Sequence, residues 1–490
     1  MAKKIQQATG TIDMFQTEKK QQSHTEEQGK FINYTGPESI VLSATAGSGK
    51  SYSCVERMKC LLERGVAPDR IIFFSFTNAA TKELQRRIGR EDVEIRTIHS
   101  FCGKVLTRLK KGKAIVSFFD FINWYKNKNK PSKFSPKEDV DEFNEIISNM
   151  YEDSSMYDAQ IAAFKLQSAD KIKCRVPEFW QSYREFLMET KSRDFSDMII
   201  EVRDLFKEDR YLSIFKNKYD YVFVDEYQDT SSIQMQILLA LNAKHYYLVG
   251  DKNQSLYMYS GASCDKVEAM VRARRKTVDM NLTINFRSDK AIVENSNKHS
   301  SLVAVPNSVN DGYINNRIIY TIDGLIDVLT GQGEVAVLAR TNGVIKSLEL
   351  ELMKRHIPLR YFNYITKSDI DSYHKDTMSV PTRNRFETVK PYFNGSIPSF
   401  LAFLKSCEES KKFITSIHKS KGLEFETCIV VNSVSYEILE ENGILEQLSS
   451  KQLSKISYDP SDEDDIESKN VHYVAISRSK HKLFYMVFDF

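Results

Sequence analysis

Short apolar runs recur along the chain, and several are followed by segments in which apolar residues repeat with the spacing of a helix. Strands that are buried on both faces read as continuous apolar runs, and helices are the usual connections between parallel strands. The pattern therefore predicts an α/β protein in which two parallel-sheet units follow one another. The expected strands cover residues 40–42, 71–74, 221–224, 246–249, 335–338, 429–430 and 483–487.

Two stretches interrupt this pattern. Residues 104–193 contain helix-like segments rich in lysine and aromatic residues but no comparable strand, so they predict a helical insertion in the first unit. Residues 361–412 are irregular and predict a small insertion in the second unit. The expected first unit comprises residues 28–103 and 194–280, and the expected second unit comprises residues 281–360 and 413–490.

Composition narrows the class of protein only a little. A chain of 490 residues exceeds one ordinary domain and has enough apolar residues for separate cores. Its 69 basic and 66 acidic side chains nearly cancel, so any affinity for nucleic acid requires a local groove. Net charge by itself therefore predicts no partner.

Cysteine usage and hydropathy indicate the compartment. The seven cysteines are scattered without a C-x-x-C pair, which argues against a zinc site, an iron–sulfur cluster and a disulfide framework. No apolar run is long enough to cross a bilayer, and the opening MAKKIQQATG lacks the apolar core of a secretory signal. We expect a soluble protein without a membrane partner, in the cytoplasm of a bacterial cell or in host cytoplasm if the protein is viral.

A candidate phosphate-binding loop follows the first expected strand. The segment ATAGSGKS covers residues 44–51, and its glycines let backbone N–H groups curl around phosphates at the start of a helix. Lys50 would neutralise the β and γ phosphates of ATP, and the Ser51 hydroxyl would hold Mg²⁺. The loop itself would contribute Ala46, Gly47, Ser48 and Gly49 to ATP binding. Ala44 stands where such loops usually have their first glycine, so a plain Gly-Ser turn remains an alternative.

An acidic pair ends a later strand. The run YVFV at residues 221–224 leads directly into Asp225 and Glu226, which would place Asp225 on the metal and Glu226 beside the attacking water. Alone, such a pair is usually a solvated strand end. Together with a phosphate-binding loop, it indicates ATP hydrolysis.

The residues of these motifs resemble those of one family, the UvrD, Rep and PcrA group of superfamily 1 helicases. DEYQD at residues 225–229 resembles the D-E-x-Q-D box of that group, and VGDKNQSLY at residues 249–257 is similar to its G-D-x-x-Q-S-I-Y segment. Ordered motifs extend from about Gln28 to Lys482. The resemblance implies two RecA-like P-loop NTPase domains in tandem and an ATP-dependent DNA helicase or translocase that moves 3′ to 5′ in DNA replication, repair or recombination.

The resemblance also assigns the remaining groups around ATP. Gln28 matches the glutamine that reads adenine, and Gln254 matches the γ-phosphate sensor. Arg287 in NFRS matches the arginine that touches the γ-phosphate, and Glu424 in KGLEF matches the glutamate that holds the ribose. Arg478 in YVAISR would be the arginine finger. ATP and Mg²⁺ are the implied cofactors.

A track for single-stranded DNA should combine exposed aromatic rings, on which bases stack, with small polar groups that contact phosphates. Tyr259 occupies the place where relatives usually have a base-stacking tryptophan. The expected partners are single-stranded DNA and junctions between single and double strands. The positions that match the strand-contacting motifs of the family are Phe76, Thr77, Asn78, Thr97, His99, Tyr257, Tyr259, Arg340, Thr341, Asn342 and His418.

Two departures from the family leave the activity open. The insertion at residues 361–412 is much smaller than the mobile domain of relatives, and Ser260 replaces an arginine next to the DNA site. The protein could unwind duplexes, or it could be a DNA-stimulated ATPase that translocates or strips proteins and unwinds only with a partner. An RNA helicase and a nucleotide-controlled switch subunit are weaker alternatives. A monomer or weak oligomer is expected.

The amino-terminal arm contains one further motif. Residues 1–27 are mostly polar and predict a disordered arm. Within it, TIDMF at residues 11–15 resembles short peptides that insert an aliphatic and an aromatic side chain into a sliding-clamp pocket, here Ile12 and Phe15. A residual apolar cluster in a tail is the alternative explanation.

Overall fold

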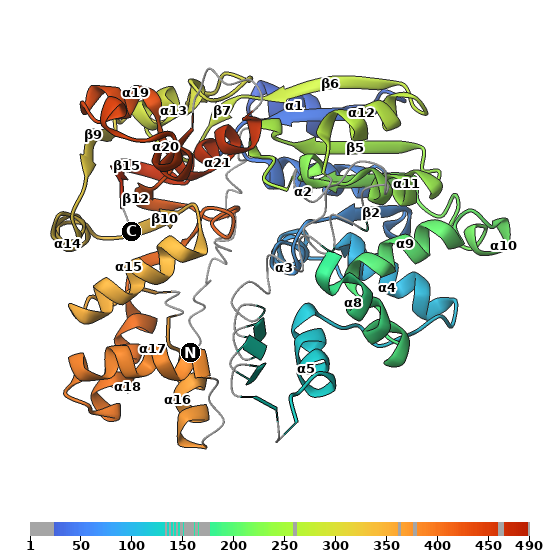
Figure 1. Ribbon diagram of the computed structural model, residues 1–490. Helices are drawn as coiled ribbons and strands as arrows, with labels where there is room; N and C mark the ends of the chain where they lie inside the picture. The colour runs from blue at the N-terminus through green and yellow to red at the C-terminus, as the bar shows by residue number, and fades with distance from the viewer. Residues whose placement is uncertain are drawn as a thin grey trace, which may run out of the picture.

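The computed structural model contains two large parallel β-sheets, each covered by helices, and two short two-stranded parallel pairs (Figure 1). The first sheet has six strands in the order β3-β2-β4-β5-β1-β6, and the second has five in the order β11-β10-β12-β15-β9. The expected α/β architecture with two sheet units in succession is confirmed. The structure describes residues 24–132, 135–136, 139–140, 142–143, 146–147, 150, 161, 165, 177–257, 262–360, 364–375, 380–458 and 465–488.

All neighbouring strands of the first sheet are parallel. The four expected strands of this sheet are present. The sequence pattern missed β3, which has only three residues, and β6, an edge strand in which most side chains remain partly exposed, so neither forms a continuous apolar run. The strands are β1 (Ser39–Ala44), β2 (Ile71–Phe74), β3 (Glu94–Arg96), β4 (Tyr221–Asp225), β5 (His245–Gly250) and β6 (Thr277–Leu282).

Helices cover both faces of the first sheet, and alternate strand residues supply two separate cores. Phe73 lies in the core beneath α1, α2 and α3, whereas Ile72 and Phe74 lie in the core beneath α4, α9, α11 and α12. The helices are α1 (Glu26–Ile32), α2 (Lys50–Glu63), α3 (Asn78–Ile88), α4 (Ile98–Arg108), α9 (Phe195–Leu205), α10 (Asp209–Leu212), α11 (Ser232–Ala240) and α12 (Cys264–Arg272).

The first helix shortens the expected amino-terminal arm. Helix α1 begins at Glu26, because Thr25 and Gln28 form a reciprocal capping box. The expected arm at residues 1–27 therefore reaches no further than the start of this helix. Ile12 and Phe15, the residues of the clamp hypothesis, lie outside the described residues.

The first insertion has a core of its own. Helices α5 (Phe118–Lys128) and α8 (Pro177–Glu189) pack together through aromatic side chains that include Phe121 and Tyr183. An isolated parallel β-bridge between Ile115 and Arg193 joins the two ends of the insertion. Residues 104–108, expected in the insertion, instead finish α4 and bury Val105 in the core of the first sheet. Helical periodicity cannot show which of two cores receives a helix.

The second sheet is also entirely parallel. Its three expected strands are present, and the two that the pattern missed, β9 and β11, are its edges. The strands are β9 (Tyr313–Ile319), β10 (Val335–Ala339), β11 (Lys412–Ser416), β12 (Phe425–Val431) and β15 (Ser479–Met486). The surrounding helices are α13 (Lys290–Asn297), α14 (Ile322–Gly331), α15 (Asn342–Lys354), α19 (Tyr436–Glu441), α20 (Ser450–Ile456) and α21 (Ile466–Ile476).

The second insertion is small and helical. It consists of α16 (Lys367–His374), α17 (Val380–Val389) and α18 (Ile397–Glu409), which share a core around Phe386, Phe393 and Phe400. The short elements that remain are η1 (Pro68–Arg70), η2 (Tyr227–Asp229), η3 (Lys252–Gln254), η5 (Lys390–Phe393), η6 (Leu445–Gln447), β7 (Ile284–Asn285), β8 (Val305–Pro306), β13 (Val434–Ser435) and β14 (Ser457–Tyr458).

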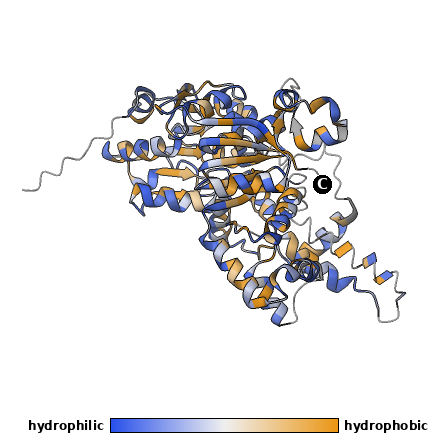
Figure 2. Ribbon diagram, turned by 90° about the vertical axis from the view of Figure 1, so that its left-hand side faces the viewer, coloured by the Kyte–Doolittle hydropathy of each residue, from blue (hydrophilic) through white to orange (hydrophobic). Residues whose placement is uncertain are grey.

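The distribution of hydrophobic residues agrees with an arrangement in which helices cover the two sheets. Figure 2 shows hydrophobic colour concentrated on the central strands and hydrophilic colour on much of the outer helical surface. Within the part of the chain that the structure describes, no helix combines the length and apolar character needed to cross a membrane.

Candidate active site

The phosphate-binding loop connects β1 to α2. Gly47 and Gly49 have φ angles of 74° and 83°, in the left-handed region that favours glycine. A Cβ on Gly47 would lie 2.8 Å from the Cβ of Arg287, so the loop also passes too close to the second domain for a side chain. Ala44 ends β1 and does not have a positive φ, so no glycine is required there. The missing first glycine of the motif therefore leaves the loop geometry intact.

Gly47→Ala should damage this loop selectively. The new methyl group would face both a strained left-handed backbone and the Arg287 side chain. We expect the free energy of unfolding to fall by about 1–3 kcal/mol and ATP affinity to fall about tenfold or more. Thermal melting and fluorescent nucleotide titration measure the two effects. Gly65→Ala, which also replaces a left-handed glycine but meets nothing within 4 Å, controls for backbone strain alone and should retain ATP affinity.

The acidic pair lies beside this loop. Asp225 ends β4, and Glu226 follows with a φ of 53°, a left-handed conformation that is uncommon outside glycine and often occurs at functional sites. The Glu226 Oε1 atom lies 3.3 Å from Lys50 Nζ. Gln228 donates a hydrogen bond to Glu226 and accepts one from the Asp251 backbone N–H at 3.2 Å. The strained turn thus directs the Glu226 carboxylate into the site.

The charges of this group depend on one another. Burial opposes the charge on Lys50, but the neighbouring carboxylates, led by Glu226, hold the pKa of its ammonium above the ordinary value. Burial also opposes the charge on Glu226, but Lys50 and Lys421 outweigh it and hold the pKa of that carboxyl low. Burial, helped by the negative charge of Glu226, raises the pKa of Asp225. The positive charges of Lys50 and Lys421 oppose this rise in the pKa of Asp225 but do not outweigh it.

This environment suits a magnesium ion. Ser51 and Asp225 offer a hydroxyl and a carboxylate oxygen, the donor types that Mg²⁺ prefers, and Mg²⁺ usually takes only one or two protein ligands and completes its shell with water and phosphate oxygens. The described residues contain no group of three or more His, Cys, Asp or Glu side chains arranged to hold a metal by themselves. The residues present thus fit a metal that is bound together with a nucleotide.

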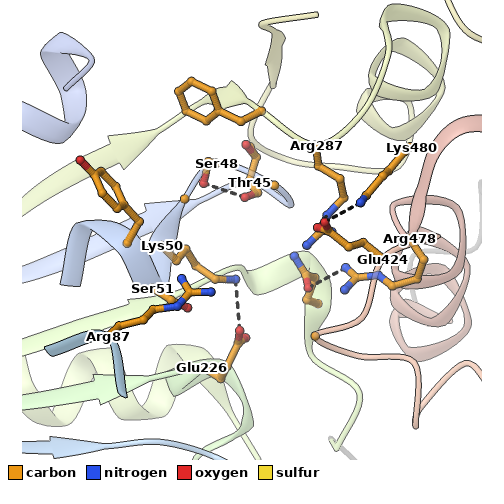
Figure 3. A pocket seen from close by; sticks show the side chains of 16 residues that line it. Thr45, Ser48, Lys50, Ser51, Arg87, Glu226, Arg287, Glu424, Arg478 and Lys480 are labelled. Atoms are coloured by element: carbon orange, nitrogen blue, oxygen red, sulfur yellow. Dashed lines mark hydrogen bonds and ion pairs between the residues drawn. The ribbon is translucent and has the colours of Figure 1, made fainter. Parts of the chain in front are cut away.

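Cationic side chains of the second domain face this group across a cavity of about 580 Å³ (Figure 3). Arg287 donates to Glu424 Oε2 at 2.9 Å and to the Ser477 carbonyl at 3.0 Å. Lys480 pairs with the other Glu424 oxygen at 2.9 Å. Figure 3 shows Lys50, Ser51 and Glu226 on one side of the cavity and Arg287, Glu424 and Arg478 on the other. Two domains therefore share one cleft.

Arg478 is almost completely buried, with 1% of its surface exposed. It donates to the Gln254 Oε1 atom at 3.2 Å and to the Val474 and Leu423 carbonyls at 3.0 and 3.3 Å. Burial, together with the positive charge of Arg287, lowers the pKa of Arg478 to about 9. An anion arriving in the cleft would relieve this cost, so the buried guanidinium is well suited to a phosphate.

Most of the predicted nucleotide residues line this cavity, but three of them, Asp225, Gln28 and Ala46, do not. Gln28 is buried and donates to the Ser48 carbonyl at 3.4 Å, while its oxygen caps α1. The Ala46 N–H donates to the Tyr473 hydroxyl at 3.4 Å. The predicted residues that line the cavity are Gly47, Ser48, Gly49, Lys50, Ser51, Glu226, Gln254, Arg287, Glu424 and Arg478.

Six further lining residues were not among the predicted site residues, and two of them, Thr45 and Gly422, lie inside the motifs ATAGSGKS and KGLEF. Tyr52 directly follows the motif residue Ser51, and Phe286 lies within the motif NFRS next to Arg287, so closeness to motif residues is the signal that could have found them. Lys480 follows Arg478 by two positions along β15. Arg87 lies on the exposed side of α3, where an arginine has no distinguishing local pattern.

A second set of predicted residues forms a line of aromatic rings. The Phe76 and Tyr257 ring centroids are 4.9 Å apart, and those of Tyr257 and His418 are 6.3 Å apart, so the line crosses from the first domain to the second. His99 packs against Phe195 at 5.6 Å, and Phe195, which the sequence analysis missed, is 54% exposed. Exposed rings of this kind can stack on nucleobases.

Three predicted threonines have a common structural role. Thr77, Thr97 and Thr341 are the N-caps of α3, α4 and α15, and each accepts a hydrogen bond from a backbone N–H of its helix. Helix N-termini favour phosphate oxygens, so these caps fit a backbone-contacting role. Asn78 and Asn342 are the first residues of α3 and α15.

The remaining predicted strand-contacting residue of the second domain, Arg340, donates to the Ser468 hydroxyl. Together with Thr341 it lines another cavity, of about 540 Å³, at the carboxyl ends of the second-sheet strands. Tyr259 and Ser260, which the sequence analysis singled out, lie outside the described residues.

The fold and the cleft together define a two-domain P-loop protein, in which the phosphate loop and acidic pair belong to one α/β domain and the arginines to the other. Residues 24–273 match the model of the UvrD/REP helicase N-terminal domain, and residues 401–489 match that of the UvrD-like helicase C-terminal domain. The chain belongs to the UvrD/REP helicase family, and the resemblance inferred from its motifs is confirmed.

Relatives with similar sequences are named as DNA helicases. The chain is 29% identical over 286 residues to a probable DNA helicase II homolog of Mycoplasma capricolum, covering 54% of this chain and 39% of that protein. It is 26% identical over 498 residues to the ATP-dependent DNA helicase PcrA of Staphylococcus aureus, covering 86% of this chain and 66% of that protein. The Staphylococcus epidermidis PcrA is 27% identical over 496 residues. The chain thus spans from about two fifths to two thirds of the length of these relatives.

Proposed function

We propose that this protein is an ATP-dependent DNA helicase or translocase that hydrolyses ATP between its two α/β domains and moves 3′ to 5′ along single-stranded DNA, in replication, repair or recombination. The observation that carries this proposal is the shared cleft, with Lys50 and Glu226 on one domain and Arg287 and Arg478 on the other. A nucleotide there would bridge the domains, so its binding and hydrolysis would close and reopen the cleft.

The chain's own groups divide the work of hydrolysis. Lys50 and the loop N–H groups would hold the phosphates, and Glu226 would orient and deprotonate the attacking water. Arg287 and Arg478 would neutralise the charge that develops on the transferred phosphoryl group. A magnesium ion, held through Ser51 and Asp225, would supply further charge neutralisation when bound.

The segment 254–257 connects the ATP site to the line of aromatic rings formed by Phe76, Tyr257 and His418. Gln254 receives the hydrogen bond of Arg478, and Tyr257 lies only three residues further along the same segment. A change in the arginine contact would therefore displace a ring that is proposed to stack on DNA. If the grips of the two domains alternate during the ATP cycle, the protein ratchets along one strand.

Tyr257→Ala should weaken the grip on DNA. The substitution removes one stacking ring, and such a ring contributes about 1–3 kcal/mol per base, so we expect the Kd for a single-stranded oligonucleotide to rise about 5- to 150-fold. Fluorescence anisotropy at fixed salt measures this. Tyr320→Ala removes a ring of the same size, half-exposed after β9, and should leave DNA affinity unchanged. Equal affinity of the wild type and Tyr257→Ala would remove Tyr257 from the DNA track.

The function itself is tested by ATP turnover with and without single-stranded DNA, and with an RNA oligomer of the same sequence. Stimulation by DNA and not by RNA is expected. Duplexes with a 3′ or a 5′ tail then test direction, and only the 3′-tailed substrate should be unwound. Turnover that does not respond to DNA would overturn the proposal and favour a nucleotide-controlled switch.

The small size of the second insertion favours one alternative. In the part of this insertion that the structure describes, helices α16, α17 and α18 have only 8, 10 and 13 residues and share one small core. DNA-stimulated turnover without unwinding of either tailed duplex would therefore identify a translocase that strips proteins, or an enzyme that unwinds only with a partner.

A further inference from the structure

Lys421 is a second-domain residue whose side chain reaches into the first domain. It belongs to the loop between β11 and β12, and its Nζ atom pairs with Asp229 and donates to the Gln254 carbonyl at 2.7 Å. The same Nζ atom lies 3.7 Å from Glu226 Oε2. The Lys421 side chain is 10% exposed and that of Asp229 is fully buried.

Glu226 therefore contacts one lysine from each domain. Lys50 approaches Oε1 at 3.3 Å from the first domain, and Lys421 approaches Oε2 at 3.7 Å from the second. The phosphates of ATP will compete for the ammonium of Lys50, because a phosphate chain carries more negative charge than one carboxylate. Once the nucleotide is bound, Lys421 is the cation that remains committed to Glu226.

Other contacts fix the position of Lys421. The second Asp229 oxygen accepts from the Leu256 N–H at 3.3 Å, so Asp229 is itself held by the first domain. Hydrogen bonds to Asp229 and Gln254 set where the ammonium lies, and a rigid cation next to a catalytic carboxylate can hold it at one angle to the water. Opening the cleft would withdraw Lys421 together with the second domain.

We propose that Lys421 is a positioning residue for Glu226, which makes the orientation of the catalytic carboxylate depend on closure of the second domain. This inference rests on the proposed ATP hydrolysis and extends it. The arginines of the second domain would act on the phosphates, whereas Lys421 would act on the group that prepares the water. In an open cleft, the phosphates would then lack the arginines and Glu226 would lack Lys421, so ATP hydrolysis would be slow.

The test is Lys421→Met, which keeps most of the side-chain length and removes the charge. Misplacement of a catalytic group by about 1 Å can cost roughly 100-fold in rate, so we expect kcat to fall about 10- to 100-fold. The nucleotide Kd, measured by titration, should change less than threefold, because Lys421 is not among the residues that line the nucleotide cavity. Lys421→Arg keeps the charge and should restore at least part of the lost kcat.

Lys419→Met is the matched control, because Lys419 lies two positions away in the same loop and is exposed. It should have the kcat of the wild type. Comparable losses of kcat and nucleotide affinity in Lys421→Met, or no rescue by arginine, would reduce Lys421 to a structural bridge and overturn the inference. An unchanged kcat in a folded Lys421→Met variant would do the same. A wild type without ATP turnover would instead refute the proposed function.

Discussion

Glu226→Gln is expected to lower kcat for ATP by about 10²- to 10⁴-fold, the contribution of a general base. Glutamine has nearly the same shape, but it cannot accept a proton from water. Its amide would also replace a carboxylate that lies 3.3 Å from the Lys50 ammonium and 3.7 Å from that of Lys421, so two ion pairs are lost from the resting site. The nucleotide should still bind, because the phosphate loop and the arginines across the cleft are unchanged.

Steady-state ATP hydrolysis in the presence of single-stranded DNA measures this effect, and nucleotide titration measures binding separately. Glu91→Gln makes the same chemical change at an exposed position before β3 and should retain full turnover. Turnover of Glu226→Gln within a factor of three of the wild type would show that another group activates the water, and the assignment of the acidic pair would have to be revised.

Arg478→Ala is expected to lower kcat by about 10³- to 10⁵-fold, the range known for arginines that stabilise a transferring phosphoryl group. The guanidinium lies in the cleft almost without solvent exposure, so its charge acts on an incoming phosphate with little screening. Its link to Gln254 also joins the two domains, at 3.2 Å. The substitution therefore removes both a catalytic charge and a contact that senses closure.

The alanine variant needs a check on folding, because the Val474 and Leu423 carbonyls each lose a hydrogen-bond donor. Arg478→Lys keeps a cation, but it cannot reproduce the planar fork, and it should recover only a small part of the rate. Arg274→Ala, at an exposed position after α12, is the control and should turn over ATP like the wild type. A folded Arg478→Ala variant with a normal kcat would exclude Arg478 from catalysis.

The strands illustrate which parts of the fold the sequence could predict. Central strands such as β4 and β10 are buried on both faces, and the resulting apolar runs mark them without reference to the rest of the chain. Edge strands such as β6 and β9 keep polar, partly exposed residues, so their pattern is not distinct from that of a loop. Their pairing depends on neighbours that are distant in sequence.

The same division applies to the cleft. The phosphate loop could be recognised without the structure, as could the acidic pair and the family motifs, because each depends on residues that are adjacent along the chain. Three other features are visible only in the folded chain: Arg87 lines the cavity, Glu226 adopts a left-handed backbone, and Lys421 reaches Asp229 across the domain boundary. These features arise from contacts between segments that are far apart in the chain, and no local spacing of residues specifies which distant side chains meet.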